Sequence, residues 1–262
     1  MSTTDPMSTD APGRRIDVLL VVGGKYHDFD YARLELLKLL AEHEEFRVRV
    51  QPDYEDTSIL DEATILVSYT CDVRPSDDAQ LRIRSWVRGG GRWVALHGTN
   101  SALGDTSVRP VATPRAFPLW ADTLGSQFIA HPPIEPYPVH VSDPDHWLVE
   151  GVQSFEATDE LYLNEYHDRD QLHPLLHTTW SGSVAGFADS DWTTTDPTQL
   201  VMYLRPLGDG AVLYNTLGHC RSHYDMTPVK QYYPNVDRCS WELPVFHQLL
   251  RRSLRWARGQ SK

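Results

Sequence analysis

Residues 89–102, GGGRWVALHGTNSA, begin with three glycines, continue with a short apolar run, and then have a histidine followed by small residues. The run RWVAL predicts a buried strand, and the small residues after it are typical of the start of a helix. A buried strand would accept another aliphatic residue at lower cost than His97. In open α/β sheets, however, a residue in a sharp turn between strand and helix is displayed at the edge where ligands bind. The stretch therefore predicts a parallel α/β sheet with His97 at its functional edge.

Segments on the N-terminal side of this strand alternate between apolar runs and amphipathic stretches. RIDVLLVVGG (15–24) and ATILVSYT (63–70) are continuous apolar runs, which are typical of parallel strands covered on both faces. FRVRVQPD (46–53) alternates in polarity, as a half-buried strand does. Crossovers between these runs are long enough for parallel pairing in one sheet. We expect strands near residues 16–22, 46–51, 63–69 and 92–97.

Two stretches in this half of the chain predict helices with one apolar face. YARLELLKLLAEH (31–43) would place Leu34, Leu37, Leu40 and Ala41 on one stripe. SDDAQLRIRSWVRGGG (76–91) begins with a serine cap and acidic residues and ends in glycines. Its apolar face would consist of Ala79, Ile83, Trp86 and Val87.

Beyond about residue 125 the predicted strands become shorter and extend the same sheet as mixed or antiparallel strands. They are QFIAH (127–131), YPVHVSD (137–143), ELYLNEY (160–166), PLLHTTW (174–180), AGFAD (185–189), TQLVMYLRP (198–206) and GAVLYNTLGH (210–219). A closing amphipathic helix would bury Phe246, Leu249, Leu250, Leu254 and Ala257. The fold class is thus α/β, a doubly wound, mainly parallel sheet with an antiparallel extension. We expect a disordered lead over residues 1–14 and a single domain over 15–262.

Composition excludes several classes of protein. The 262 residues carry a net charge of −12, which would repel nucleic acid. No apolar run approaches the roughly 18 residues of a membrane span, and the N-terminus has no apolar core of a signal peptide. Cys71, Cys220 and Cys239 have no CxxC spacing, which argues against a disulfide framework or a thiolate zinc site. We expect a cytoplasmic protein with no nucleic-acid or membrane partner.

Several motifs in a shared order resemble the ThuA-like (trehalose utilisation) family, within the flavodoxin-like or class I glutamine amidotransferase-like superfold. They are GGKYHDFDY (23–31), WVRGGGRWVALHG (86–98), QFIAHP (127–132), HWLVEGV (146–152), TDELY (158–162), LGH (217–219) and LRWARG (254–259). The resemblance implies bacterial sugar catabolism, especially of glycosides oxidised at C3 of the sugar ring. In the amidotransferases the residue at the elbow is a cysteine nucleophile, whereas this chain has His97 there. Glutamine amidotransfer is therefore not expected.

Histidines that follow predicted strands supply most of the candidate site residues. The candidates for catalysis are His27, His97, Glu160 and His219, and those for substrate binding are Asp28, His131, Trp120 and Tyr162. Glu160 is preferred to Asp159 because the resembled DE-x-Y motif centres on it, which leaves Asp159 as a solvated turn residue. Trp180 and Trp192 are further aromatic residues that could stack on a sugar ring. Cys220 fits a small buried residue better than a nucleophile.

Two chemistries fit several strand-end histidines and one carboxylate. Neutral imidazoles from His27, His97, His131 or His219, together with the carboxylate, could bind a first-row divalent metal ion that polarises a ketone. Without metal, a histidine and a glutamate could exchange a proton on the carbon next to a ketone. Neither an HExxH motif nor a GxSxG motif occurs. The cofactor is thus left open between none and a divalent metal ion.

Three functions are compatible with these features. The first is an enzyme that acts on keto-glycosides or related carbohydrates by proton transfer, with isomerisation or loss of the glycosidic oxygen. The second is a non-catalytic carbohydrate-binding protein of the same fold. The third is a scaffold subunit that pairs, for example as a homo-oligomer, through its terminal helix and a sheet edge.

Overall fold

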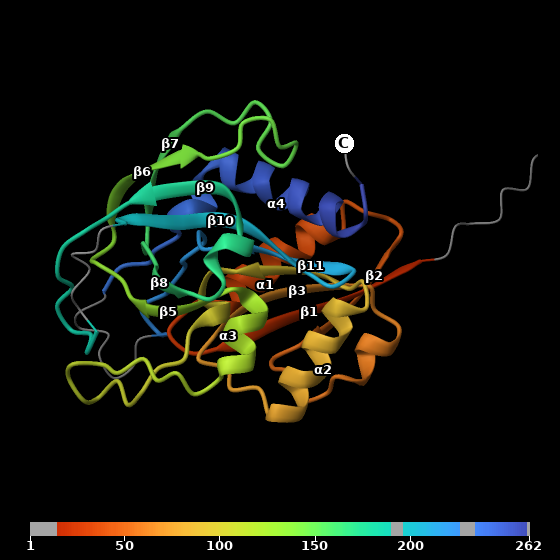
Figure 1. Ribbon diagram of the computed structural model, residues 1–262, viewed down its shortest axis with the longest axis horizontal. Helices are drawn as coiled ribbons and strands as arrows, with labels where there is room; N and C mark the ends of the chain where they lie inside the picture. The colour runs from red at the N-terminus through yellow and green to blue at the C-terminus, as the bar shows by residue number, and fades with distance from the viewer. Residues whose placement is uncertain (1–14, 190–195, 226–233, 261–262) are drawn as a thin grey trace, which may run out of the picture.

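A nine-stranded mixed sheet forms the centre of the molecule (Figure 1). The computed structural model describes residues 15–189, 196–225 and 234–260, so the lead over residues 1–14 lies outside the described residues, as does Trp192. The strand order across the sheet is β2-β1-β3-β4-β11-β10-β9-β6-β7. None of the helices in the described ranges is long and apolar enough to cross a membrane.

One half of the sheet is parallel, as the apolar runs predicted. It consists of β2 (Phe46–Gln51), β1 (Ile16–Gly24), β3 (Ile65–Cys71), β4 (Arg92–Leu96) and β11 (Gly210–Asn215). Every neighbouring pair among these five strands is parallel. The carboxyl ends of the strands are in register, since Leu96 lies opposite both Tyr69 and Asn215. One edge of the sheet therefore gathers the residues that follow these strands.

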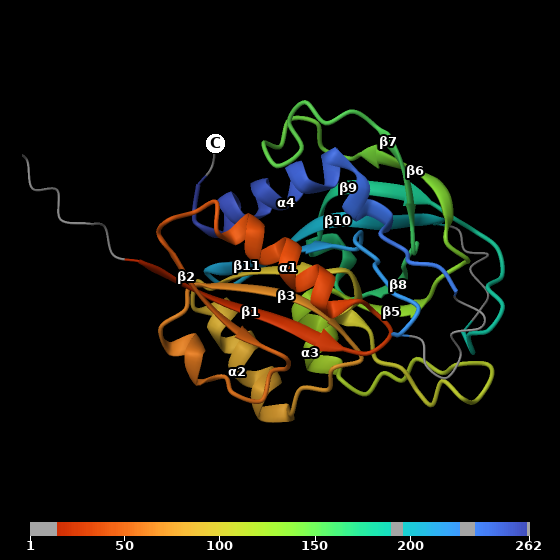
Figure 2. The same cartoon turned by 180° about the vertical axis from the view of Figure 1, so that it is seen from behind.

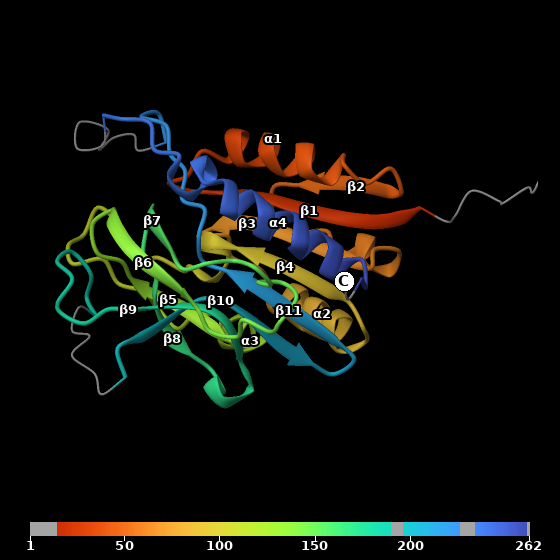
Figure 3. The same cartoon turned by 90° about the horizontal axis from the view of Figure 1, so that it is seen from above.

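The other half of the sheet is antiparallel and continues from β11 (Figure 3). It consists of β10 (Thr198–Leu207), β9 (His173–Thr179), β6 (Glu135–Val141) and β7 (Phe155–Asp159). Two of the strands expected here lie elsewhere, because β5 (Ser126–Ala130) and β8 (Leu163–Tyr166) pair with each other in a separate two-stranded sheet. Residues 185–189 form no strand, and only Phe187 makes an isolated bridge, to Val111.

Helices cover both faces of the sheet (Figure 2). On one face lie α1 (Phe29–Leu40) and α4 (Pro244–Ala257), and on the other lie α2 (Asp77–Arg88) and α3 (Pro118–Leu124). Short 3₁₀ turns occur at Ser58–Asp61, His97–Asn100, Arg169–Gln171 and Cys239–Glu242. The arrangement is a three-layer α/β/α sandwich, which is the doubly wound class expected from the sequence.

Two glycines of the opening stretch, Gly91 and Gly98, are explained by close packing. Ser76 caps α2 through its side chain, and the Trp86 indole N–H donates to the carbonyl of Ala63. A Cβ atom on Gly91 would lie 2.5 Å from the Trp86 ring. A Cβ atom on Gly98 would lie 2.6 Å from the carbonyl oxygen of Thr70. Both distances are too short for a side chain, so these positions require glycine.

The apolar face of α1 differs from the expected stripe. Leu34 is 52% exposed, although it was expected to face the core. Leu40 is buried as expected and Leu37 is partly buried, whereas Ala41 is exposed. The other buried residues of the helix are Ala32, Leu36 and Leu39. Because leucines occur on more than one side of this helix, its own periodicity is ambiguous. Contacts with β1 and α4 decide which side is buried.

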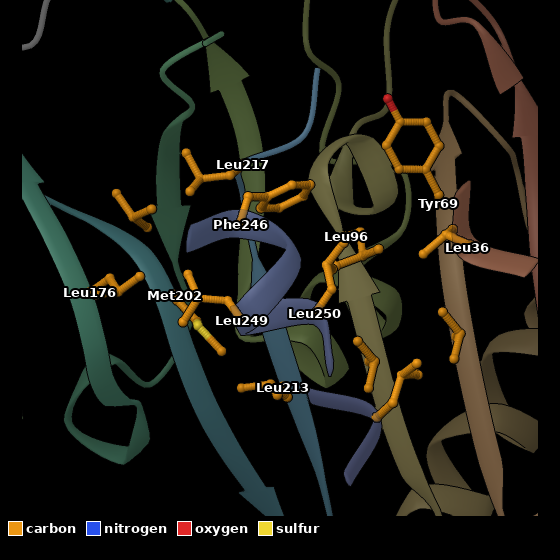
Figure 4. Close-up of a cluster of buried hydrophobic side chains, with 14 of the residues drawn as sticks. Leu36, Tyr69, Leu96, Leu176, Met202, Leu213, Leu217, Phe246, Leu249 and Leu250 are labelled. Atoms are coloured by element: carbon orange, nitrogen blue, oxygen red, sulfur yellow. The ribbon is translucent and has the colours of Figure 1, made fainter. Parts of the chain in front are cut away.

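The terminal helix α4 packs on the sheet as its sequence predicted. All five residues of its expected apolar face are buried, and several of them contact strand residues such as Leu96, Met202 and Leu213 (Figure 4). This face is therefore used inside the molecule, and it offers no apolar surface for pairing with another chain.

Candidate active site

Five candidate residues lie at or shortly after the ends of strands and come together in the structure. His97 follows β4, His131 follows β5, and Glu160 follows β7. His27 comes three residues after β1, and His219 comes four residues after β11. The ring centroid of His27 lies 4.8 Å from the ring centroid of His97 and 4.9 Å from that of His219. Residues 192 positions apart in the sequence thus meet at one edge of the sheet.

His97 occupies a left-handed turn between β4 and the 3₁₀ turn after it. Its φ angle is 44°, which is uncommon for a residue with a side chain. The Nδ1–H group donates to the carbonyl of Thr216 at 2.8 Å, and the His97 carbonyl accepts from the Tyr214 hydroxyl. The hydrogen bond from Nδ1 fixes the orientation of the ring, so that Nε2 points toward His27. The side chain is completely buried, whereas the turn between strand and helix predicted a residue displayed at the ligand-binding edge.

His27 is held in the same way, by a backbone carbonyl. Its Nδ1–H group donates to Lys25 at 3.0 Å, which leaves Nε2 only 2.9 Å from Nε2 of His97. Burial lowers the pKa of His27 well below its ordinary value, and the nearby charges of His97 and His219 lower it further. His27 is therefore neutral near pH 7.

Glu160 is the carboxylate of the cluster. Its Oε2 lies 3.2 Å from Nδ1 of His219 and 3.5 Å from Nε2 of His97, and its Oε1 lies 3.7 Å from Nε2 of His131. Burial alone would raise the pKa of Glu160, but the nearby imidazoles of His131, His219 and His97 lower it well below the ordinary range. Glu160 is therefore an ionised carboxylate inside the protein.

Asp159 anchors the backbone of this cluster and is not a solvated turn residue. The side chain is fully buried and accepts four backbone N–H groups. The donors are Glu160, Gly218, His219 and Ser240. A single carboxylate thus joins the turn that carries Glu160 to the turn that carries His219. The pair Asp159 and Glu160 stands out in the sequence, but the anchoring role of Asp159 depends on backbone contacts that only the structure shows.

We expect Asp159→Asn to lower the free energy of unfolding by about 3 kcal/mol, because hydrogen bonds to a buried charged group are strong and an amide N–H₂ would face backbone donors. Chemical denaturation of the variant and of the wild type measures the difference. Asp209→Asn is the control, since Asp209 lies on the exposed turn between β10 and β11. Equal loss of stability in both variants would contradict this role of Asp159.

A cavity of about 1110 Å³ opens above the cluster. His27, Glu160 and His131 line it, whereas His97 and His219 are buried and do not line it. Tyr162 also lines the cavity, and its hydroxyl lies 3.3 Å from Nε2 of His97. The wall also contains the aromatic residues Tyr26, Phe29, Phe128 and Phe187 and the charged residues Lys25, Arg109, Arg221, Asp225 and Asp237. Aromatic and charged groups around a polar floor suit a polyhydroxylated ligand.

Other candidates from the sequence lie outside this cavity. Trp120 is buried against Tyr54 and Trp93, and its indole N–H donates to Thr99, so no face is free to stack on a sugar. Asp28 caps α1 and pairs with Arg238 at 2.9 Å.

Trp180 packs against the core and does not line the cavity, so it has no place in the candidate site. Cys220 is buried, as expected, and burial raises the pKa of its thiol to about 12. The Tyr69 hydroxyl lies 3.2 Å from its sulfur atom.

The fold and the site define a class, namely α/β sandwich proteins with a histidine and carboxylate cluster at the carboxyl edge of the sheet. Residues 17–235 match the ThuA family, which is described as trehalose utilisation. The chain belongs to the ThuA family. No curated protein matches it in sequence.

Solved structures of ThuA-like proteins share this fold. One from Parabacteroides merdae superposes with a TM-score of 0.65 at 16% identity, covering 95% of this chain and 92% of the other. One from Bacteroides uniformis gives the same score and identity, covering 96% and 95%. A β-galactosidase from Rahnella sp. R3 gives a TM-score of 0.55 at 13% identity, where 94% of this chain corresponds to 32% of that enzyme. At these identities the likeness concerns the fold alone.

Proposed function

We propose that the protein is a sugar-catabolic enzyme that acts on glycosides carrying a ketone in the sugar ring. The observation that supports this most is the position of Glu160 beside His131 in the wall of the cavity, with its oxygens 3.2 to 3.7 Å from imidazole nitrogens of three histidines. A buried carboxylate and an adjacent imidazole are suited to proton transfer. Membership of a family described as trehalose utilisation favours a carbohydrate as the substrate.

The chemistry starts at the carbon next to the ketone, where a proton is acidic. In a glycoside oxidised at C3, a base removes the proton from C2, and the electron pair of that bond forms an enolate on the C3 oxygen. When the enolate collapses, the C1–oxygen bond breaks, and the glycosidic oxygen leaves with a proton from an acid. Water can then add across the resulting double bond, which regenerates a free keto-sugar. Glu160 and His131 both line the cavity and can exchange these protons.

We expect the protein to release free sugar from a disaccharide oxidised at C3 of one ring, and not from the unoxidised disaccharide. In D₂O, deuterium should replace the proton at C2 of the oxidised ring, because that proton exchanges through the enolate. Proton NMR of the two sugars, incubated with and without protein, measures both events. Specific binding of the oxidised sugar with neither exchange nor cleavage would contradict an enzyme and favour a carbohydrate-binding protein.

A further inference from the structure

We propose that His27, His97, Glu160 and His219 form a binding site for one divalent first-row transition metal ion. These four buried residues each offer a ligand atom, and all four atoms lie within 4.8 Å of one another. Three imidazoles and one carboxylate are a donor set typical of zinc, iron, manganese, cobalt or nickel, and not of magnesium or calcium, which prefer oxygen ligands.

The histidine tautomers are the first argument. Backbone carbonyls of Thr216 and Lys25 accept from Nδ1 of His97 and His27, so in the neutral rings both Nε2 atoms carry lone pairs and no proton. These two lone pairs face each other at 2.9 Å. Such an arrangement is repulsive unless a cation or an additional proton lies between the rings. A carbonyl behind each imidazole is also the usual support of a metal-binding histidine.

The distances are the second argument. Two nitrogens bound to one ion at about 2.05 Å and at about 90° to each other would lie about 2.9 Å apart. The observed separation of the Nε2 atoms of His27 and His97 has this value. The Oε2 atom of Glu160 lies 3.2 Å from His219 and 3.5 Å from His97, within the range that adjacent ligands of one ion occupy.

His219 is the third argument. Its side chain is almost completely buried, yet neither ring nitrogen makes a hydrogen bond of good geometry within the part of the chain that the structure describes. An imidazole without hydrogen bonds is costly in a protein interior. Coordination of an ion shared with Glu160 would use one of these nitrogens and neutralise the buried carboxylate.

The position of the site relative to the cavity suggests its use, and this step rests on the proposed function. Of the four residues, His27 and Glu160 line the cavity, whereas His97 and His219 are not among its lining residues. A five- or six-coordinate ion with four protein ligands keeps one or two positions for substrate oxygens. A ketone and its neighbouring hydroxyl could occupy them, so that the ion stabilises the enolate. Glu160 would then be a ligand, which leaves His131 as the group that moves the proton.

Metal content and affinity test the site without any sugar. Protein stripped with a chelator and then incubated with Zn²⁺, Mn²⁺ or Co²⁺ should retain about one ion per chain after desalting, measured by plasma mass spectrometry. In calorimetric titrations with Zn²⁺, His27→Ala and Glu160→Gln should raise Kd by at least about 100-fold. His173→Ala should bind as the wild type does, since His173 is an exposed residue that pairs with Asp143.

A second readout uses the unmodified protein and is independent of how the variants fold. Zn²⁺ added to ¹⁵N-labelled apoprotein should shift the Nε2 resonances of His27 and His97 and leave those of His173 and His177 in place. If Zn²⁺, Mn²⁺ and Co²⁺ all fail to bind and no ring nitrogen shifts, an additional proton between the two rings explains their contact and the metal site is wrong. Equal affinity of the wild type, His27→Ala and Glu160→Gln would also overturn it. Because no sugar is present, neither result depends on the proposed reaction.

Discussion

Glu160→Gln is expected to lower turnover of a keto-glycoside by about 10³-fold while the protein stays folded. The substitution keeps the shape of the side chain and removes its negative charge, and Glu160 is the only carboxylate within the four-residue cluster. As a base, a neutral amide cannot accept the proton. As a ligand, it cannot balance the charge of a bound ion. Both roles therefore predict a large loss, which steady-state kinetics on the oxidised disaccharide measures.

Glu156→Gln is the matched control for this variant. Glu156 lies on the same strand, β7, but it is exposed and does not line the cavity. Its variant should have the wild-type rate. Retention of more than about a tenth of the activity by Glu160→Gln would exclude both roles, because a positioned acid or base contributes at least about 100-fold.

Much of the parallel half of the fold could be predicted because its signals are local. The apolar runs of β1 and β3 and the capped helix α2 each specify their own structure within about ten residues. The same is true of the residues that follow strands, since the carboxyl ends of parallel strands share one edge. For this reason the sequence alone predicts that His27, His97 and His219 lie near one another.

The remaining features depend on contacts between distant segments. The pairing of β5 with β8 instead of with the main sheet, and the burial of Leu36 in place of Leu34, are decided by which neighbour each element meets. Asp159 was expected to be a solvated turn residue because three of its four backbone donors, Gly218, His219 and Ser240, are 59 to 81 positions away in the sequence. Contacts over such separations are not visible in the local sequence. Trp120 looked like a platform for a sugar, but aromatic residues are as suitable for the core.

The two ring nitrogens of His97 make different contacts, Nδ1 with Thr216 and Nε2 with His27. Two amide variants can test the two contacts separately. In His97→Asn the shorter amide lies near the position of Nδ1 and can still donate to Thr216. Asparagine also tolerates the left-handed backbone that His97 adopts at φ 44°. In His97→Gln the longer amide reaches toward the position of Nε2, beside His27 and Glu160. Alanine is less informative, because removal of a completely buried ring leaves a cavity that itself destabilises the fold.

If Nε2 of His97 serves proton transfer or metal binding, both amide variants should lose turnover by about 10²–10⁴-fold, because neither amide can shuttle a proton or replace imidazole well as a ligand. His97→Asn should nonetheless keep a melting temperature close to that of the wild type, since the contact with Thr216 and the backbone conformation are preserved. Kinetics on the oxidised disaccharide and thermal unfolding, measured on the same preparations, give both values. A purely structural His97 predicts a different pattern, in which His97→Asn turns over at nearly the wild-type rate and each variant loses activity only as far as it loses stability. That pattern would mean that His97, which follows β4, only stabilises the turn, and that Glu160 and His131 carry out the proton transfer in the cavity.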